Sequence, residues 1–251
     1  MYPDLFGIPD FSYTLMLLLG IFSAIGLLIF YLWKQKINRN GIIDTIVSAC
    51  AAIVFGVMGA ILTQNLYNFI KEPNSFHWAW GMTFYGGLFF GVGSFLLVFY
   101  LLERKQKNVS IKEILIIAPA CITLAHAFGR IGCLLAGCCY GIETNAWFGL
   151  QCSEYDSLKR VPTQLFEAIF LFILSFALSL LAFKKKFTLN FPMYMLAYGV
   201  FRFVIEFFRD DERGGANIGL SPSQIWCIVL VACSIPLAIV FRKFIFNKEN
   251  N

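Results

Sequence analysis

Two arginines stand inside long apolar stretches of this sequence. Arg130 follows an apolar segment that begins APACIT, and Arg202 lies in MYMLAYGVFRFVIEFFRDDERG. An arginine at the centre of a membrane helix costs roughly 2.5–3.5 kcal/mol on insertion scales, so it marks a functional site by default. Both arginines lie near a predicted end of their segment, where the alternative is a side chain that extends its guanidinium to the membrane surface.

The residues after Arg202 form a group of alternating charge. Glu206 lies four residues after Arg202 and Arg209 lies seven after it, so a continuous helix places all three on one face. A glutamate between two arginines neutralises one and leaves the other for an anion, which makes Arg209 a candidate substrate-binding residue. The alternative is a buried ion-pair network that ties helices together.

A second stripe of polar residues surrounds Arg130. His126 lies four residues before it, Cys133 lies three after it, and Gly137 continues the stripe if the helix extends that far. Glycines permit close approach and leave space in front of the cation. The glycines of this segment are Gly129, Gly132, Gly137 and Gly141. A cation with space in front of it suits a phosphate better than a packed core.

The same segment raises the question of a metal or redox site. Cys133, Cys138 and Cys139 have the spacing C-x4-C-C, which lacks the C-x2-C pairs of structural zinc sites. With His126 as a fourth ligand, Arg130 would lie among thiolates with no carboxylate nearby in the sequence. We therefore expect no bound metal and no cofactor.

A disulfide and an inert role are the other possibilities for these cysteines. Cys152 is a candidate disulfide partner for Cys138 or Cys139 on an oxidising side of the membrane. The other four cysteines lie in apolar segments, where a thiol is most often a small buried hydrophobe. These four are Cys50, Cys121, Cys227 and Cys233.

The composition is that of a membrane protein. Of 251 residues, 59% are hydrophobic and only 14% are charged, and the chain contains 28 phenylalanines. Soluble domains have about 45–50% apolar and about 25% charged residues. The basic residues form no stripe with interleaved aromatics on one domain, so we expect membrane lipid and no nucleic acid as a partner.

Seven apolar segments are long enough, or nearly so, to cross a bilayer, which takes roughly 20 helical residues. The sequence therefore predicts an all-α integral membrane protein with seven transmembrane helices in a single domain, residues 1–251. Proline is expected in the first turn of the last three helices. The segments are Phe11–Trp33, Asp44–Phe69, Met82–Leu102, Glu113–Leu135, Pro162–Phe183, Phe191–Phe208 and Ser221–Phe241.

The loops predict an orientation. Thirteen of the twenty lysines and arginines lie in loops on one side of the seven segments, and five lie on the other. The positive-inside rule places the N-terminus outside and the C-terminus in the cytoplasm. The first apolar segment has no positive region before it, so we expect a retained helix. The outer loops, at about 1–10, 70–81, 136–161 and 209–220, are the longer ones and predict a working face on the outside.

Three motifs in the same order make the chain resemble the prolipoprotein diacylglyceryl transferases. The G-R-x-G signature of that family is matched by GRIG, Gly129–Gly132, and its R-x-P-[ST]-Q-L-[YF]-E-A element by RVPTQLFEA, Arg160–Ala168. Its Y-G-x-[FA]-R-F-x-[IV]-E-F-x-R element is matched by YGVFRFVIEFFR, Tyr198–Arg209. The resemblance implies seven spans with an outer N-terminus, in a bacterial cytoplasmic (inner) membrane.

The resemblance also implies a reaction. Members of this family transfer a diacylglyceryl group from phosphatidylglycerol to the thiol of a lipoprotein-signal cysteine and release glycerol phosphate. Prolipoprotein signal peptides would then be the second substrate, although the acceptor stays open for this chain. Two desolvated arginines would stabilise the phosphate as its bond to carbon breaks.

The family's site residues carry over position by position. Arg130 and Arg202 resemble its phosphate-contacting arginines, and Glu206 resembles the carboxylate that orients Arg202. The remaining matches are a pair of polar pocket residues and a first-helix tyrosine, whose usual glycine neighbour is replaced by Thr14 here. These residues are Gln164, Glu167 and Tyr13.

Four positions depart from the family pattern. In YGGLFFG, Tyr85 stands where the family has the histidine given a general-base role. Cys133, Ala136 and Cys138 replace two asparagines and a glutamate. His126 is a candidate for the missing base, and Tyr85 is another if a cation such as Arg130 lowers its pKa.

These departures motivate two alternatives to a transferase. One is a non-catalytic phospholipid-binding or scaffolding membrane protein with the same fold. The other is a redox protein that uses the three clustered cysteines. A carrier or channel is less favoured, because the charged residues gather towards one face of the membrane and not at its midplane.

Overall fold

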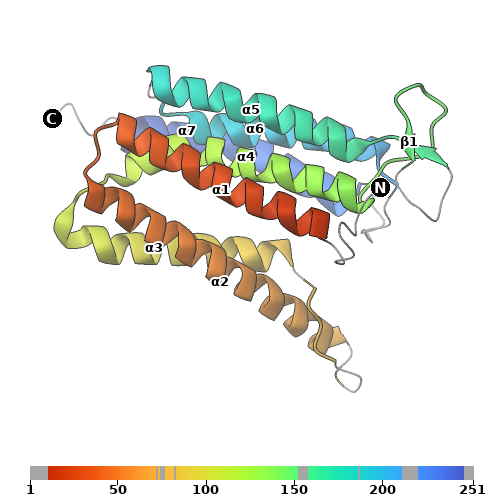
Figure 1. Cartoon of the computed structure of the whole chain (residues 1–251), viewed down its shortest axis with the longest axis horizontal. Coiled ribbons are helices and arrows are strands. Elements are labelled where there is room, and N and C mark those ends of the chain that lie inside the picture. Colours follow the sequence, from red (N-terminus) through yellow and green to blue (C-terminus); the bar gives the residue numbers. More distant parts are fainter. Residues whose placement is uncertain are drawn as a thin grey trace. The chain divides into compact units, whose positions relative to one another are not determined.

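The computed structural model describes residues 11–71, 73, 77–81, 83–151, 158–185, 187–210 and 220–245. The predicted N-terminal loop and Cys152 lie outside these ranges. Within them the chain is mainly helical (Figure 1). The long helices are α1 (Phe11–Lys34), α2 (Arg39–Lys71), α3 (Phe84–Gln106), α4 (Ile111–Ala136), α5 (Thr163–Lys185), α6 (Asn190–Ile205) and α7 (Pro222–Val240).

The prediction of seven membrane-crossing segments is confirmed. Each long helix, α6 together with the turn that follows it, is long and apolar enough to cross a bilayer. Many large apolar side chains lie on the surface: Phe22, Phe89 and Ile173 are 68%, 74% and 64% exposed. Such a surface is stable in lipid and not in water. The chain is a multi-pass membrane protein.

The helix ends differ from the predicted ends where side chains cap the backbone. The Asn38 side chain accepts a hydrogen bond from the Gly41 N–H (2.7 Å), so α2 begins five residues before the predicted Asp44. Pro222 is the first residue of α7, after a capping box formed by Ser221 and Gln224. Pro162 was expected inside the first turn of α5 but precedes that helix.

The described residues form two compact units, and the smaller one comprises Leu32–Ser110. In this unit α2 packs against α3 through small residues. A side chain at Gly86 would collide with Thr63, and one at Gly56 would lie 3.3 Å from the Gly87 carbonyl oxygen. Close backbone approach of this kind is how helices associate in membranes.

The larger unit contains α1 up to Tyr31 and everything from Ile111 onward. Its helices are joined by polar bonds inside an apolar bundle. The Asn190 side chain donates to the carbonyls of Ile116 (2.9 Å) and Leu178 (3.0 Å), which ties the start of α6 to α4 and α5. That the two units together form a single transmembrane domain stays a prediction.

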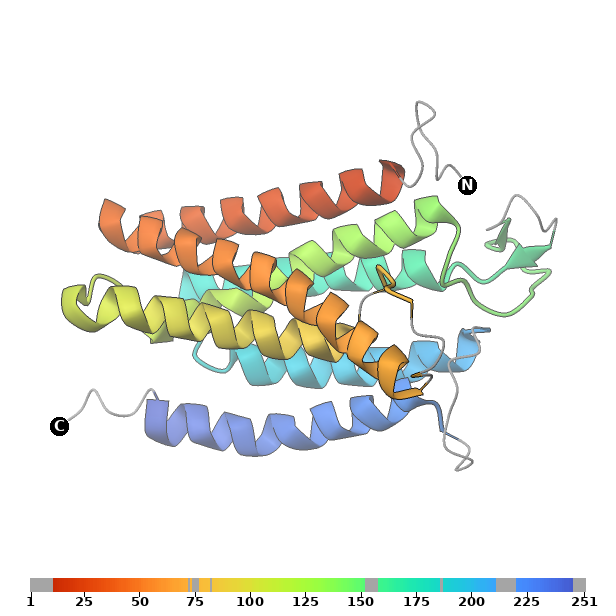
Figure 2. The ribbon, with the colours of Figure 1, turned by 90° about the horizontal axis from the view of Figure 1, so that it is seen from below.

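One end of the larger unit gathers the segments that the sequence singles out. Figure 2 shows the start of α1, the end of α4, the start of α5, the end of α6 and the start of α7 at this end. A short antiparallel ribbon, β1 (Leu150–Gln151) with β2 (Lys159–Arg160), lies in the connection between α4 and α5. In this connection Gly141 forms a β-bridge with Arg209. A side chain added at Gly141 would collide with the Phe208 carbonyl.

Candidate functional site

A buried carboxylate pairs with Arg130. Glu167, on the first turns of α5, is fully buried, and its Oε2 lies 3.0 Å from Arg130 Nε. The other oxygen of Glu167 accepts a hydrogen bond from the Tyr198 hydroxyl on α6 (3.0 Å) and lies 3.8 Å from His126 Nε2. No carboxylate lies near Arg130 in the sequence, as noted above. Its partner comes from another helix.

A second ion-pair group forms at the end of α6. Arg202 Nη1 lies 2.6 Å from Glu206 Oε2, and Arg209 Nε lies 3.8 Å from the same oxygen. The predicted continuous helix ends at Ile205, and Glu206–Phe208 form a 3₁₀ turn that keeps the three charges together. Glu206 also accepts a bond from the Ser221 hydroxyl (2.8 Å), so this carboxylate joins α6 to the start of α7.

The two groups converge across α4, α5 and α6. Arg130 and Arg202 both interact electrostatically with Glu167 and with Tyr198. Among the described residues three guanidinium groups thus lie with two carboxylates, and each guanidinium has five N–H donors. Like charges converge at low dielectric only where anions compensate them. The geometry therefore offers N–H donors and positive charge to one further anion.

Gln164 and Tyr13 lie beside this group. Gln164 is fully buried; its Nε2 donates to the Cys138 carbonyl (2.6 Å), while its Oε1 has no hydrogen-bond partner among the described residues. Tyr13, on the first turn of α1, has its ring over Gly132, where an added Cβ would lie 3.0 Å from Cδ2. The structure thus places Tyr13 within electrostatic reach of Arg130 and Gln164 against the loop after α4. That both bind substrate stays a prediction.

The end of α4 explains why three cysteines meet. The Cys138 N–H bonds to the Cys133 carbonyl (3.1 Å) and the Gly137 N–H to the Leu134 carbonyl (3.2 Å), with Gly137 at φ 70°. This is a Schellman motif, which brings the side chains at its two ends into contact. The helix therefore does not extend to Gly137, the condition under which this glycine would continue the stripe, because α4 ends at Ala136.

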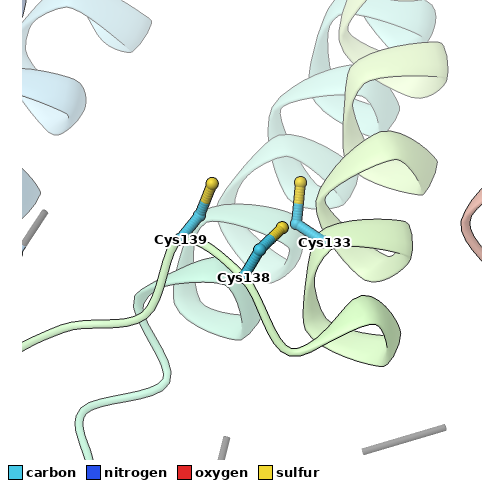
Figure 3. A group of neighbouring side chains, drawn as sticks. All are labelled: Cys133, Cys138 and Cys139. Carbon is cyan, nitrogen blue, oxygen red and sulfur yellow. The ribbon is translucent and has the colours of Figure 1, made fainter. Parts of the chain in front are cut away.

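The sulfurs of Cys133, Cys138 and Cys139 lie within 4.8 Å of one another and point to a common space (Figure 3). Hydrogen bonding to Cys133 and then to Cys139 raises the pKa of the Cys138 thiol. Hydrogen bonding from the other two thiols, with the nearby Arg209, lowers the pKa of Cys139. The predicted disulfide to Cys152 lies outside the described residues.

The loop after α4 contributes an apolar pocket beside the charged group. Its volume is about 380 Å³, and its lining includes Ile142, Phe148, Phe166 and Ile205. Ile205 directly precedes Glu206, so an apolar group in the pocket would lie next to the second ion-pair group. Near the same loop Arg160 pairs with the half-exposed Asp210 (2.6 Å).

Some contributors were not singled out from the sequence. Tyr194 and Tyr198 precede Arg202 by eight and four residues. The four-residue spacing that places Arg202 and Glu206 on one helix face therefore also indicates these two tyrosines. Tyr194 and Tyr198 stack, and the Tyr198 ring packs edge-on to His126 (5.3 Å between centroids). The sequence indicates Ser221 only as the start of the last helix. Tyr85 lies at the start of α3 in the smaller unit, and its pairing with Arg130 stays a prediction.

Comparisons with known proteins decide the family. The model of the prolipoprotein diacylglyceryl transferase family matches residues 4–240. The chain belongs to this family. A Clostridium tetani protein named phosphatidylglycerol–prolipoprotein diacylglyceryl transferase is 32% identical over 97% of this chain and 95% of its own length.

Further relatives in the prolipoprotein diacylglyceryl transferase family carry the same kind of name. A Clostridium perfringens protein, phosphatidylglycerol–prolipoprotein diacylglyceryl transferase 2, is 33% identical over 93% of this chain and 92% of its own length. A Rickettsia rickettsii relative is 32% identical over 80% of this chain and 78% of its own length. The similarity spans the arginines, the glutamates and the three clustered cysteines, so the charged group lies in the family region of the chain.

Proposed function

We propose that this protein transfers a diacylglyceryl group from phosphatidylglycerol to the thiol of a prolipoprotein signal peptide and releases glycerol phosphate. The relatives' names specify this donor and this class of acceptor. Membership of a transferase family supports catalysis over a purely lipid-binding role.

One observation carries the proposal: Arg130 and Arg202 converge from two apolar helices on the buried Glu167. Near the ends of membrane helices these arginines lie at the depth of the lipid headgroups, and the anion found there is the phosphodiester of a phospholipid. Its leaving phosphate gains negative charge as the carbon–oxygen bond breaks, and guanidinium groups already held in place stabilise that charge without reorganisation.

The carboxylates hold the arginines in position in this proposal. Glu206 fixes Arg202 through a 2.6 Å contact, and Glu167 fixes Arg130 through a 3.0 Å contact. Arg209, near the same oxygen of Glu206, supplies a third positive charge. Each carboxylate also accepts a hydroxyl bond, from Ser221 and from Tyr198, which keeps its orientation fixed.

Gln164 and Tyr13 are proposed to contact the substrate. The Gln164 amide oxygen has no partner among the described residues, although the side chain is fully buried, so it can accept a bond from a glycerol hydroxyl. Tyr13 lies at 36% exposure beside Gly132, at the edge of the site where a lipid headgroup would enter.

His126 and Tyr85 are the candidates for the group that takes up the acceptor's proton. His126 lies one helical turn before Arg130 and is part of the charged group through Glu167. Tyr85 occupies the position where the family pattern has histidine. Neither assignment is needed for the binding of the donor phosphate.

We also propose the orientation in the membrane. The basic loops on one side of the seven helices support a cytoplasmic C-terminus and an outer N-terminus in the bacterial inner membrane. The charged group then lies towards the outer face, because it is built from the ends of α4 and α6 and the starts of α5 and α7.

Complementation tests the proposed function. The wild-type gene is expressed in a bacterium depleted of its own prolipoprotein diacylglyceryl transferase, beside an Arg202→Gln variant. Growth and lipid-modified lipoproteins are expected with the wild type and not with the variant. A wild-type protein present in the membrane at normal levels, with unmodified prolipoproteins accumulating, would support the non-catalytic alternative instead.

A further inference from the structure

The three thiols at the end of α4 have no part in phosphate binding. We infer that Cys133, Cys138 and Cys139 hold one zinc ion whose fourth coordination position takes the acceptor thiol. This inference rests on the proposed function, because it assigns the step that makes the acceptor sulfur a nucleophile. It departs from the sequence-based expectation that no metal is bound.

The distances fit a zinc ion. A tetrahedral ion at about 2.3 Å from each sulfur places the sulfurs about 3.8 Å apart. The three sulfurs lie within 4.8 Å of one another, so no pair has to close by more than about 1 Å. All three side chains point into the same space from the end of α4 and from the loop after it (Figure 3).

The backbone of this group is held in place by bonds that a metal would not disturb. The Schellman motif joins Cys133 to Cys138 through the backbone, and Cys139 is in the left-handed region at φ 64°. The Cys138 carbonyl accepts from Gln164 Nε2, and the Cys139 carbonyl accepts from the Thr163 hydroxyl (3.0 Å). Both anchors come from the start of α5. The carbonyls are thus occupied while the sulfurs face a common space.

The donor set indicates a thiophilic ion with an open position. Thiolates select zinc and copper(I) over hard cations. Among the described residues no histidine, carboxylate or fourth cysteine joins the group. Three protein ligands with one position left for water or substrate are the arrangement of catalytic zinc sites, and a fourth protein ligand is the arrangement of structural ones.

The site lies where an acceptor thiol has to arrive. Cys133 is one helical turn after Arg130, and the Arg209 guanidinium hydrogen-bonds to the Cys139 thiol. The open position therefore adjoins the proposed phosphate anchors. Cys133 and Cys138 are also two of the positions that depart from the family pattern, in a chain whose usual basic histidine is replaced by Tyr85.

The step balances without a further reactant. The acceptor thiol binds zinc and releases its proton to the base proposed above, because a thiol is deprotonated on coordination. The zinc-bound sulfur then attacks the glyceryl carbon that carries the phosphate. The new carbon–sulfur bond forms as the carbon–oxygen bond breaks, and its electron pair leaves on the phosphate, next to the arginines. The thioether product is a weak ligand and dissociates.

Metal content of the purified full-length protein is the first test. Wild-type protein is stripped with a chelator, reloaded with zinc, freed of excess and measured by mass spectrometry of the metal. About one zinc per chain is expected. Loss of zinc is expected in Cys133→Ser/Cys138→Ser/Cys139→Ser and retention in the control Cys50→Ser/Cys233→Ser. Equal zinc content in both variants, or none in the wild type, overturns the inference.

Cobalt substitution tests the open position. Cobalt(II) bound to the wild-type protein is expected to show thiolate charge-transfer absorption, and a peptide with the acceptor cysteine should shift its visible bands. The same peptide with serine in place of cysteine should leave the spectrum unchanged. Identical spectra with the two peptides overturn the assigned role, as does selective loading with copper(I) that excludes cobalt and zinc.

Activity separates this inference from the proposed function and needs no variant. Chelation of the wild-type enzyme is expected to lower transfer by about 100-fold or more, the usual contribution of proton removal, and zinc should restore it. Full transfer by the stripped enzyme overturns the zinc site and leaves the proposed function standing. Zinc bound in full with no transfer overturns both the proposed function and the role assigned to the ion.

Discussion

At the residue scale, the site depends on carboxylates that hold arginines in a low-dielectric surrounding. Glu167 is completely buried and contacts Arg130 and His126 on α4 and Tyr198 on α6. Removal of one member of a buried ion pair leaves an uncompensated charge, which costs far more than an exposed pair contributes. Loss of the Glu167 charge should therefore lower both the stability and the activity of the protein.

Glu167→Gln keeps the shape of the side chain and removes its charge. The free energy of unfolding should fall by about 3–5 kcal/mol, because Arg130 stays buried without its partner. Transfer activity should fall by about 10–150-fold, the loss of one hydrogen bond between charged groups. The control is Asp210→Asn, in the half-exposed pair with Arg160, where a change under about 1 kcal/mol is expected.

Thermal unfolding in detergent and labelled-lipid transfer measure the two effects. Wild-type activity in Glu167→Gln would show that Arg130 needs no carboxylate to act. A loss in Asp210→Asn as large as that in Glu167→Gln would show that burial does not decide the cost of breaking these pairs.

At the element scale, the ends of helices build the site more than their middles do. Glu206 lies on the 3₁₀ turn after α6, and Arg209 follows that turn in an extended conformation. Ser221 caps the start of α7, and its hydroxyl donates a hydrogen bond to Glu206. The Schellman motif after α4 places the cysteines. The sequence predicts the helices and the arginine faces well, because both follow a period of 3.6 residues.

The helix ends and their contacts could not be predicted from periodicity. The C-x4-C spacing lacks the pattern of structural zinc motifs, and it is the six-residue turn at the end of α4 that brings the thiols together. Glu167 lies 37 residues from Arg130 in the sequence, and only the packing of α5 on α4 relates them.

Gly137→Ala tests the role of this turn. Gly137 has φ 70°, a conformation that costs other residues about 1–2 kcal/mol. The variant should be less stable by that amount and should bind less zinc, because Cys133 and Cys138 lose their fixed distance. The matched control is Gly26→Ala, inside α1. An added Cβ at Gly26 has no packing neighbour within 4 Å.

The control should be more stable by about 0.5–1 kcal/mol, because alanine is the better helix residue. Unfolding in detergent and metal content after reloading measure both variants. An equal effect of the two substitutions would contradict the assigned turn.

At the scale of the whole molecule, the loops and the seven helices determine where the site works. The apolar surface requires lipid, and the basic loops support the proposed orientation. Composition and hydropathy predict the number of helices correctly, because a bilayer imposes a nearly constant length on each one. Such patterns do not contain the identity of the group that takes up the proton of the acceptor thiol.

The orientation predicts the behaviour of reporter fusions. Alkaline phosphatase, which is active only outside the cytoplasm, should be active when fused after Gly215 and inactive when fused after Lys186, since α6 lies between these points. A fluorescent protein that matures only in the cytoplasm should fluoresce at the C-terminus. The opposite pattern would place the charged group on the cytoplasmic side and contradict the proposed outer face.

The central claim is that a phospholipid phosphate held by the arginines leaves as a thiol takes its place. The most direct measurement incubates the purified protein with phosphatidylglycerol and a cysteine-containing signal peptide and quantifies glycerol phosphate and modified peptide together. We expect equal amounts of the two products with the wild type and at least about tenfold less of both with Arg130→Gln or Arg202→Gln. Undiminished formation of both products by these variants, or no product from zinc-loaded wild type, would contradict the claim.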